Sequence, residues 1–187
     1  MSKPSINLRD LVILVADGSS YFSMLVHGML RGFGTSKVIE VRDAVDALRI
    51  MTSQRVDVLI CDAKLPPHGG QALTRAIRRK PDNEHRTIPI LMMSADTREA
   101  TIKRARDAGA NMVVAKPLSP LNLYDRLAWI AMTPRQFVEC QNYFGPDRRF
   151  KNDGYQKGPG RRQVDQPAQT AADGVSAERT EPALSVT

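Results

Sequence analysis

The chain has 187 residues, of which 42% are hydrophobic and 25% are charged, and its formal net charge is +7. These proportions are ordinary for a soluble globular protein, and the positive charge favours an anionic partner without identifying one. No apolar stretch approaches the roughly 18 residues of a membrane span, and no basic-then-apolar leader is present. We therefore expect a cytoplasmic protein without membrane insertion.

Short apolar runs alternate with helical patterns through the first two thirds of the chain. The runs lack polar alternation, which is typical of strands buried on both faces, and they lie at 11–15, 38–41, 56–61, 88–93 and 112–115. Apolar residues at helical spacing predict five helices, which begin near Ser19, Ala44, Ala72, Thr97 and Ser119. At the end of the third helix, Arg78, Arg79 and Lys80 suit the negative end of the helix dipole.

This alternation predicts an α/β fold, in which a five-stranded parallel sheet is doubly wound with five helices. In such sheets, binding sites form beyond the carboxyl ends of the strands, near the point where the strand order switches. Four polar residues stand just past a predicted strand, namely Asp17, Asp62, Ser94 and Lys116. The rule singles them out as candidate site residues.

These residues belong to short motifs that follow one another along the chain: Leu14-Val15-Ala16-Asp17, Asp62-Ala63-Lys64-Leu65-Pro66, Met93-Ser94-Ala95 and Lys116-Pro117. On these motifs, residues 9–132 resemble the CheY-like receiver domain of two-component response regulators, which has a flavodoxin/CheY-like fold. The resemblance implies that Asp62 accepts a phosphoryl group from a histidine kinase. It also implies that Asp17 and Asp62 hold Mg²⁺, and that Lys116 and Ser94 contact the phosphoryl group as switch residues. Such a domain is a signalling module and not an enzyme.

Three positions depart from the usual receiver pattern. Ala16 stands where receivers usually carry the first of two acidic residues, and the loss of an oxygen ligand weakens Mg²⁺ binding. Lys64 adds positive charge near the metal position, and Val113 stands where many receivers have an aromatic switch residue. The simpler alternative is that Asp17 and Asp62 are exposed loop carboxylates.

From Pro134 onward the apolar runs vanish and a short unit is repeated. Gly145-Pro146-Asp147-Arg148-Arg149 recurs as Gly158-Pro159-Gly160-Arg161-Arg162, and the first copy follows Tyr143 and Phe144 while the second follows Tyr155. We divide this part into an arginine-rich ligand-binding segment, 133–163, and a disordered end, 164–187. The segment has too little apolar content to bury a core, so we expect it to be disordered or ordered by a ligand.

The chemistry of the repeat suits a guanine nucleotide. Arginine pairs bidentately with guanine O6 and N7, and it also stacks on bases and contacts phosphates. Asp147 is able to accept hydrogen bonds from the guanine N–H groups, and aromatic rings offer stacking surfaces worth roughly 1–3 kcal/mol per base. Gly-Pro turns would aim each arginine pair. The candidate binding residues are Tyr143, Phe144, Asp147, Arg148, Arg149, Tyr155, Arg161 and Arg162.

A receiver with such a tail resembles the Cle proteins, CheY-like effectors of cyclic di-GMP that act on the bacterial flagellar motor. The resemblance implies that the tail binds cyclic di-GMP and that the protein then docks on a motor component or another signalling protein. Three rival interpretations remain: a conventional phosphorylation switch at Asp62, nonspecific nucleic-acid binding by the tail, and a solvated extension without a ligand. Sequence-specific DNA binding is not expected.

Overall fold

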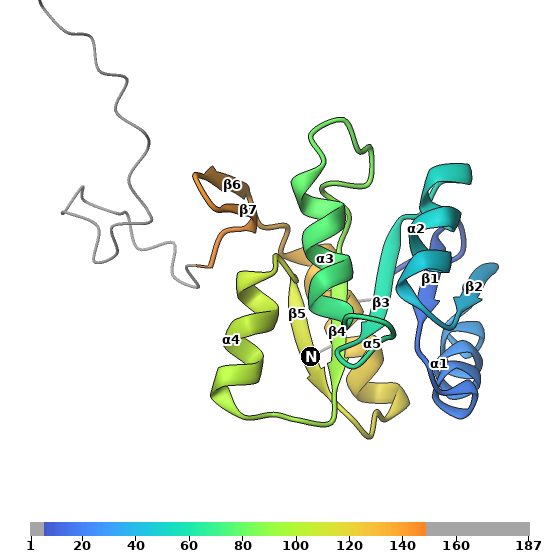
Figure 1. The fold of residues 1–187 in the computed structure, drawn as a ribbon. Coiled ribbons are helices and arrows are strands. Elements are labelled where there is room, and N and C mark those ends of the chain that lie inside the picture. The colour runs from blue at the N-terminus through green and yellow to red at the C-terminus, as the bar shows by residue number, and fades with distance from the viewer. Residues whose placement is uncertain (1–5, 149–187) are drawn as a thin grey trace, which may run out of the picture.

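The computed structural model describes residues 6–148, and it confirms the predicted doubly wound fold (Figure 1). Five parallel strands lie in the order β2-β1-β3-β4-β5. They are β1 (Val12–Ala16), β2 (Lys37–Val41), β3 (Val58–Asp62), β4 (Ile90–Ser94) and β5 (Met112–Ala115). The helices are α1 (Ser20–Gly32), α2 (Ala44–Ser53), α3 (Gly70–Arg79), α4 (Glu99–Asp107) and α5 (Pro120–Met132).

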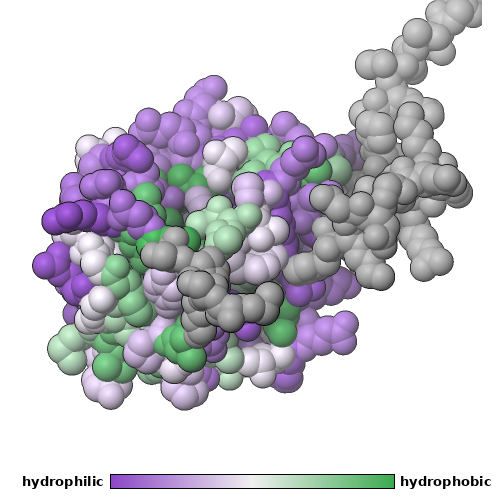
Figure 2. All heavy atoms as spheres, turned by 180° about the vertical axis from the view of Figure 1, so that it is seen from behind, coloured by the Kyte–Doolittle hydropathy of each residue, from purple (hydrophilic) through white to green (hydrophobic). Residues whose placement is uncertain are grey.

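The helices cover the two faces of the sheet and divide the core in two. Val26 of α1 and Leu127 of α5 pack on one face, and Met51 of α2, Leu73 of α3 and Ala105 of α4 pack on the other. Figure 2 views the molecule from the side opposite to Figure 1, where hydrophobic side chains form patches within a mostly hydrophilic surface. Within residues 6–148, none of the helices is long and apolar enough to cross a membrane.

Local signals that the sequence displays account for several element boundaries. The Ser19 hydroxyl caps α1 by accepting from the amide of Phe22, and Ser119 caps α5 in the same way with Pro120 in the first turn. By contrast, β3 and β4 each begin two residues later than predicted. The apolar residues Val56 and Ile88 precede these strands because their backbone groups bond side chains, namely His85 and Arg78.

An antiparallel hairpin follows α5 and consists of β6 (Phe137–Cys140) and β7 (Tyr143–Pro146). Here the structure differs from the expectation that the chain beyond residue 133 lacks fixed structure without a ligand. The hairpin forms no core of its own and packs instead against the ends of α3 and α4 (Figure 1). Gly145 and Pro146 therefore form the buried end of a strand and not a turn that aims the following arginines.

Two glycines allow the hairpin to come this close to the domain. Gly109 has φ of +100°, and a Cβ atom there would lie 2.9 Å from Cγ of Arg78 and 3.0 Å from the carbonyl oxygen of Phe144. A Cβ atom on Gly145 would lie 2.9 Å from Cα of Gly109. Because such distances are shorter than van der Waals contact, a side chain at either position would push the hairpin away.

Arg78 lies beneath the hairpin and is only 1% exposed, so it does not serve as a surface partner of the helix dipole. Its guanidinium donates to four oxygens: Gly109 O (3.1 Å), Arg86 O (2.6 Å), Ile88 O (2.8 Å) and Asn111 Oδ1 (3.0 Å). It also lies 5.0 Å from the centre of the Phe137 ring. Burial lowers the pKa of Arg78 to about 10, so the group is charged at neutral pH.

We predict that Arg78→Met lowers the free energy of unfolding by about 3 kcal/mol, because it leaves buried acceptors without a donor. Chemical denaturation followed by circular dichroism measures this loss. The neighbouring exposed residue supplies the control, since Arg79→Met should change stability by no more than about 0.5 kcal/mol. Equal stability of the two variants would contradict the structural role of Arg78.

Candidate functional site

Three of the four residues that the strand-end rule selected meet at one edge of the sheet. Lys116 Nζ lies 2.6 Å from Asp17 Oδ2 and 3.0 Å from Asp62 Oδ1. The side chains of Asp17, Lys116 and Asp62 are 1%, 10% and 16% exposed. The two carboxylates follow β1 and end β3, which are neighbours where the strand order switches, so they face a common space. The alternative that Asp17 and Asp62 are merely exposed loop carboxylates is therefore excluded.

Local contacts hold this ion triad of Asp17, Asp62 and Lys116 in place. The second oxygen of Asp17, Oδ1, accepts from the amide of Ser19 at 2.9 Å, so both oxygens of the buried carboxylate have a partner. The ammonium group of Lys116 lies 4.3 Å from the centre of the Phe22 ring. Phe22 was not recognised from the sequence as a site residue, although its place one turn into the first helix puts it beside the strand ends.

Two carboxylates and one ammonium group meet at this edge, where the resemblance predicted a Mg²⁺ site. Magnesium takes six oxygen ligands, of which a protein commonly supplies one or two carboxylates while water supplies most of the rest. Asp17 and Asp62 supply two carboxylates, Ala16 supplies none, and the ammonium of Lys116 stands between the two. No cluster of three or more His, Cys, Asp or Glu residues suited to a metal exists within residues 6–148. The positive charge that balances the carboxylates here is that of Lys116.

Ser94, the fourth predicted residue, is buried at the end of β4 and bonds within its own loop. Its hydroxyl donates to the carbonyl oxygen of Asp96 (2.8 Å) and accepts from the amide of the same residue (3.1 Å). The Ser94 hydroxyl thus holds the backbone of the loop that leads into α4. Within the described chain, its hydrogen bonds do not include Asp62.

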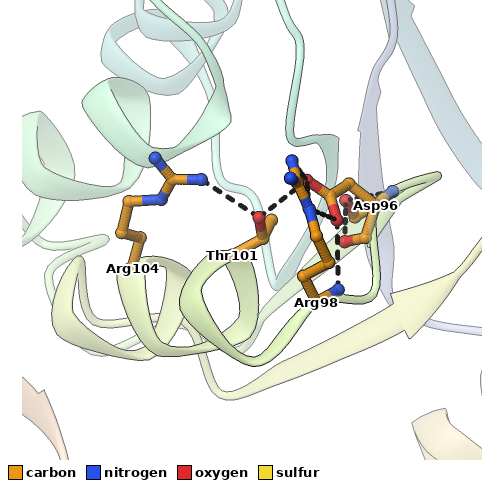
Figure 3. Close-up of polar contacts among 5 residues, drawn as sticks. Asp96, Arg98, Thr101 and Arg104 are labelled. Carbon is orange, nitrogen blue, oxygen red and sulfur yellow. Dashed lines mark hydrogen bonds and ion pairs between the residues drawn. The ribbon is translucent and has the colours of Figure 1, made fainter.

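Asp96 organises the start of α4 (Figure 3). Its carboxylate accepts from Arg98 Nη2 at 2.6 Å and from Thr101 Oγ1 at 2.9 Å, and Thr101 in turn accepts from Arg104 at 3.0 Å. Hydrogen bonds from the Arg98 side chain, and then from its amide and from Thr101, hold the pKa of Asp96 well below its usual range. The sequence pattern predicted a helix start near Thr97. The helix instead begins at Glu99, after these contacts.

The structure also places four of the eight predicted tail residues, all on or just after the hairpin. The Phe144 ring contacts two side chains, with the Arg86 guanidinium 3.5 Å from its centre and the Phe137 ring centre 5.5 Å away. The Arg148 guanidinium lies 3.8 Å from the centre of the Tyr143 ring. The Tyr143 hydroxyl donates to the carbonyl of Pro146, and burial raises the pKa of this tyrosine. Both rings thus stack with arginines.

Arg148 and Asp147 are anchored as well. Arg148 Nη1 lies 2.7 Å from Asp107 Oδ1 at the end of α4. The amide of Asp147 donates to the carbonyl of Gln136 at 2.8 Å, which extends the hairpin by one bond. Arg149, Tyr155, Arg161 and Arg162 lie outside the described residues.

The hairpin and the ion triad lie at opposite ends of the sheet. The triad gathers where β1 and β3 end, whereas the contacts of the hairpin are with Arg86 before β4 and with Gly109 before β5. A ligand bound at the hairpin therefore cannot touch Asp62 directly.

We predict that Lys116→Met lowers the free energy of unfolding by about 3–5 kcal/mol in metal-free buffer, because the buried Asp17 carboxylate loses its counter-charge. Millimolar Mg²⁺ should restore more stability to this variant than it adds to the wild type, since the two carboxylates become available to the cation.

Thermal unfolding with and without Mg²⁺ tests both effects, and Lys64→Met, at an exposed lysine two residues after Asp62, is the control. A variant as stable as the wild type, or equal stabilisation of both proteins by Mg²⁺, would contradict the assignment of Lys116 as the resident cation.

Comparison with known proteins agrees with this geometry. Residues 13–128 match the response regulator receiver domain. The chemotaxis protein CheY of Pseudomonas aeruginosa is 30% identical over 115 residues, which are 62% of this chain and 91% of CheY. The sensory/regulatory protein RpfC of Xanthomonas campestris is 30% identical over 131 residues, which are 70% of this chain but only 18% of RpfC.

A solved structure is similar over the same part. The receiver domain of the sensor histidine kinase PA1611 from Pseudomonas aeruginosa, with a magnesium ion coordinated in its active-site cleft, is 29% identical with a TM-score of 0.57. The similarity covers 64% of this chain and 94% of that domain. Because the family match extends over more than half of its residues and the strand order, ion triad and motifs agree with it, this chain belongs to the response regulator receiver domain family.

Proposed function

We propose that this receiver binds cyclic di-GMP through its arginine-rich segment, 133–163, and then signals by docking on a partner protein, with a flagellar motor component as the leading candidate. The observation that carries the proposal is the repeated unit, in which an aromatic residue precedes Gly-Pro-x-Arg-Arg twice. This part of the chain looks like the tail of CleD, which is one of the Cle effectors. Two copies suit a ligand that is itself two-fold symmetric.

The hairpin geometry supports the proposal, because a guanine base would be able to take the place of Arg148 on the Tyr143 ring. Arg148 already lies at stacking distance from Tyr143, and its other contact is an ion pair with Asp107. A guanine base is able to replace the guanidinium on the tyrosine ring at little cost, because both are planar groups that stack on aromatics. The released Arg148 would then pair with guanine O6 and N7, as arginine does in nucleic-acid complexes.

A second candidate function is a conventional phosphorylation switch at Asp62. The observation in its favour is that Asp62 is partly exposed and has Lys116 3.0 Å away, where the ammonium would absorb charge on a phosphoryl group. Against it stand Ala16, which removes one carboxylate and so weakens Mg²⁺ binding, and the Ser94 hydroxyl, which is engaged with Asp96. We therefore rank it below nucleotide sensing.

We expect calorimetric titration of the intact protein to show tight binding of cyclic di-GMP and weak binding of GTP and cyclic di-AMP. Arg148→Ala/Arg149→Ala should weaken cyclic di-GMP by about 10- to 100-fold, because a bidentate arginine–guanine contact contributes about 1–3 kcal/mol. Asp62→Asn, which changes the opposite end of the sheet, should leave the affinity unchanged.

Each rival predicts a different result from the same titrations. Equal binding of all three nucleotides with a steep dependence on salt would indicate nonspecific electrostatic binding by the tail. No binding at all would exclude the sensor. Phosphorylation would then become the leading function if Asp62→Asn abolished signalling while the arginine variant retained it.

A further inference from the structure

A cleft of about 490 Å³ separates α3 from the hairpin. Its helix side is lined by arginines, and its other side by Cys140 and Tyr143 of the hairpin and by the loop between β6 and β7. The volume falls within the roughly 300–1,000 Å³ of small-molecule sites. The family motifs do not include this cleft, since it lies at the end of the sheet away from the ion triad.

Two cations in the cleft have no partner among the residues that the structure describes. Arg75 and Arg79 stand four residues apart on α3, so they project from the same side of the helix one above the other. Both line the cleft. Within residues 6–148, neither side chain takes part in a hydrogen bond or an ion pair, although the other arginines lining the cleft do.

The charges that line the cleft do not cancel. Its two carboxylates are already neutralised, Asp107 by Arg148 at 2.7 Å and Glu139 by Arg86 at 2.6 Å. The buried Arg78 donates to carbonyl and amide oxygens, none of which is anionic. Among the described residues, the guanidinium groups of Arg75, Arg78 and Arg79 therefore lack a counter-charge. They still outnumber the one carboxylate, Asp107, that loses its partner when Arg148 turns to guanine, so the cleft favours an anion.

We propose that this cleft binds a phosphodiester of the cyclic dinucleotide, with Arg75 and Arg79 as the phosphate-binding residues. This inference rests on the proposed function and places part of the nucleotide site on the receiver domain itself. The planar fork of arginine matches phosphate oxygens in a bidentate manner. Tyr143, at the margin of the same cleft, is where the base attached to that phosphate would stack.

The arrangement divides recognition between two parts of the chain. Arg75 and Arg79 of α3 would bind the phosphate of any phosphodiester through their charge. Arg148 and the arginines of the second copy of the repeat would select guanine. Arg75 and Arg79 therefore contribute affinity and little selectivity among nucleotides. Their loss should weaken binding of cyclic di-GMP and leave its preference over cyclic di-AMP intact.

The test compares Arg75→Ala/Arg79→Ala with Arg9→Ala/Arg42→Ala in the full chain by calorimetry. The second variant removes the same charge from exposed positions outside the cleft, so it controls for long-range electrostatics. We expect the first pair to weaken cyclic di-GMP by about tenfold or more, as loss of charge-assisted hydrogen bonds does, and the control pair to change it less than about twofold by screening.

Cys140 provides an independent readout, because it lines the cleft. The only other thiol of the chain, Cys61, is fully buried, and burial raises its pKa to about 12, so slow alkylation by iodoacetamide reports on Cys140 alone. Cyclic di-GMP should slow the alkylation of Cys140. Sodium pyrophosphate at the same concentration should protect it less, because it lacks a base to stack on Tyr143.

The outcomes separate this inference from the proposed function. Tight binding of cyclic di-GMP with unchanged Cys140 alkylation, or undiminished affinity in Arg75→Ala/Arg79→Ala, would overturn the cleft and leave the tail as the whole site. Equal protection by pyrophosphate would show a general anion site and overturn its assignment to the dinucleotide. No binding of cyclic di-GMP to the wild type would overturn both.

Discussion

The buried guanidinium of Arg78 is the constraint on which the hairpin end of the molecule depends. A charged group with five donors is stable in the interior only if its hydrogen bonds are satisfied. Arg78 obtains them from the loop before β4 and from the loop before β5, at Arg86, Ile88, Gly109 and Asn111. These loops are thereby fixed in the positions that receive the rings of Phe137 and Phe144.

The arginine–aromatic layer above Arg78 explains why a segment of low apolar content is ordered. Phe137 and Phe144 pack on each other, and the guanidinium groups of Arg78 and Arg86 each lie near one of the two rings. Flat cations and rings bury each other's faces while the charged edges keep their hydrogen bonds. The hairpin thus uses surfaces that the receiver fold provides, and Arg148 just after it pairs with Asp107 of α4.

This placement gives the two ends of the sheet a shared rigid element. The start of α4 is tied to Ser94 through Asp96, beside the ion triad, and its last residue, Asp107, pairs with Arg148. Binding at one end would bias the other through this helix if α4 had two arrangements that the two sites favour differently. Reciprocity would then require a partner that prefers the ligand-bound form to raise nucleotide affinity.

Sequence reasoning predicted the sheet, its helices and the gathering of Asp17, Asp62 and Lys116, because buried parallel strands and their polar ends have distinct patterns. It missed the hairpin for a physical reason. The loop between Cys140 and Tyr143 contains no glycine. In the part of the chain that the structure describes, no residue other than glycine has positive φ, so the usual hairpin signal is absent. The burial of Arg78 was equally hidden, since a basic helix end is ordinarily solvated and its acceptors come from distant loops.

The hairpin is an integral part of the folded receiver, and its order does not require a ligand. Amide hydrogen exchange of the ligand-free protein tests it most directly, with the amide of Asp147, which donates to Gln136 at 2.8 Å, as the most informative single probe. We expect Asp147 and the paired amides of β6 and β7 to exchange far more slowly than those of an unstructured peptide. Exchange at unprotected rates throughout 137–147, with the sheet still protected, would contradict it.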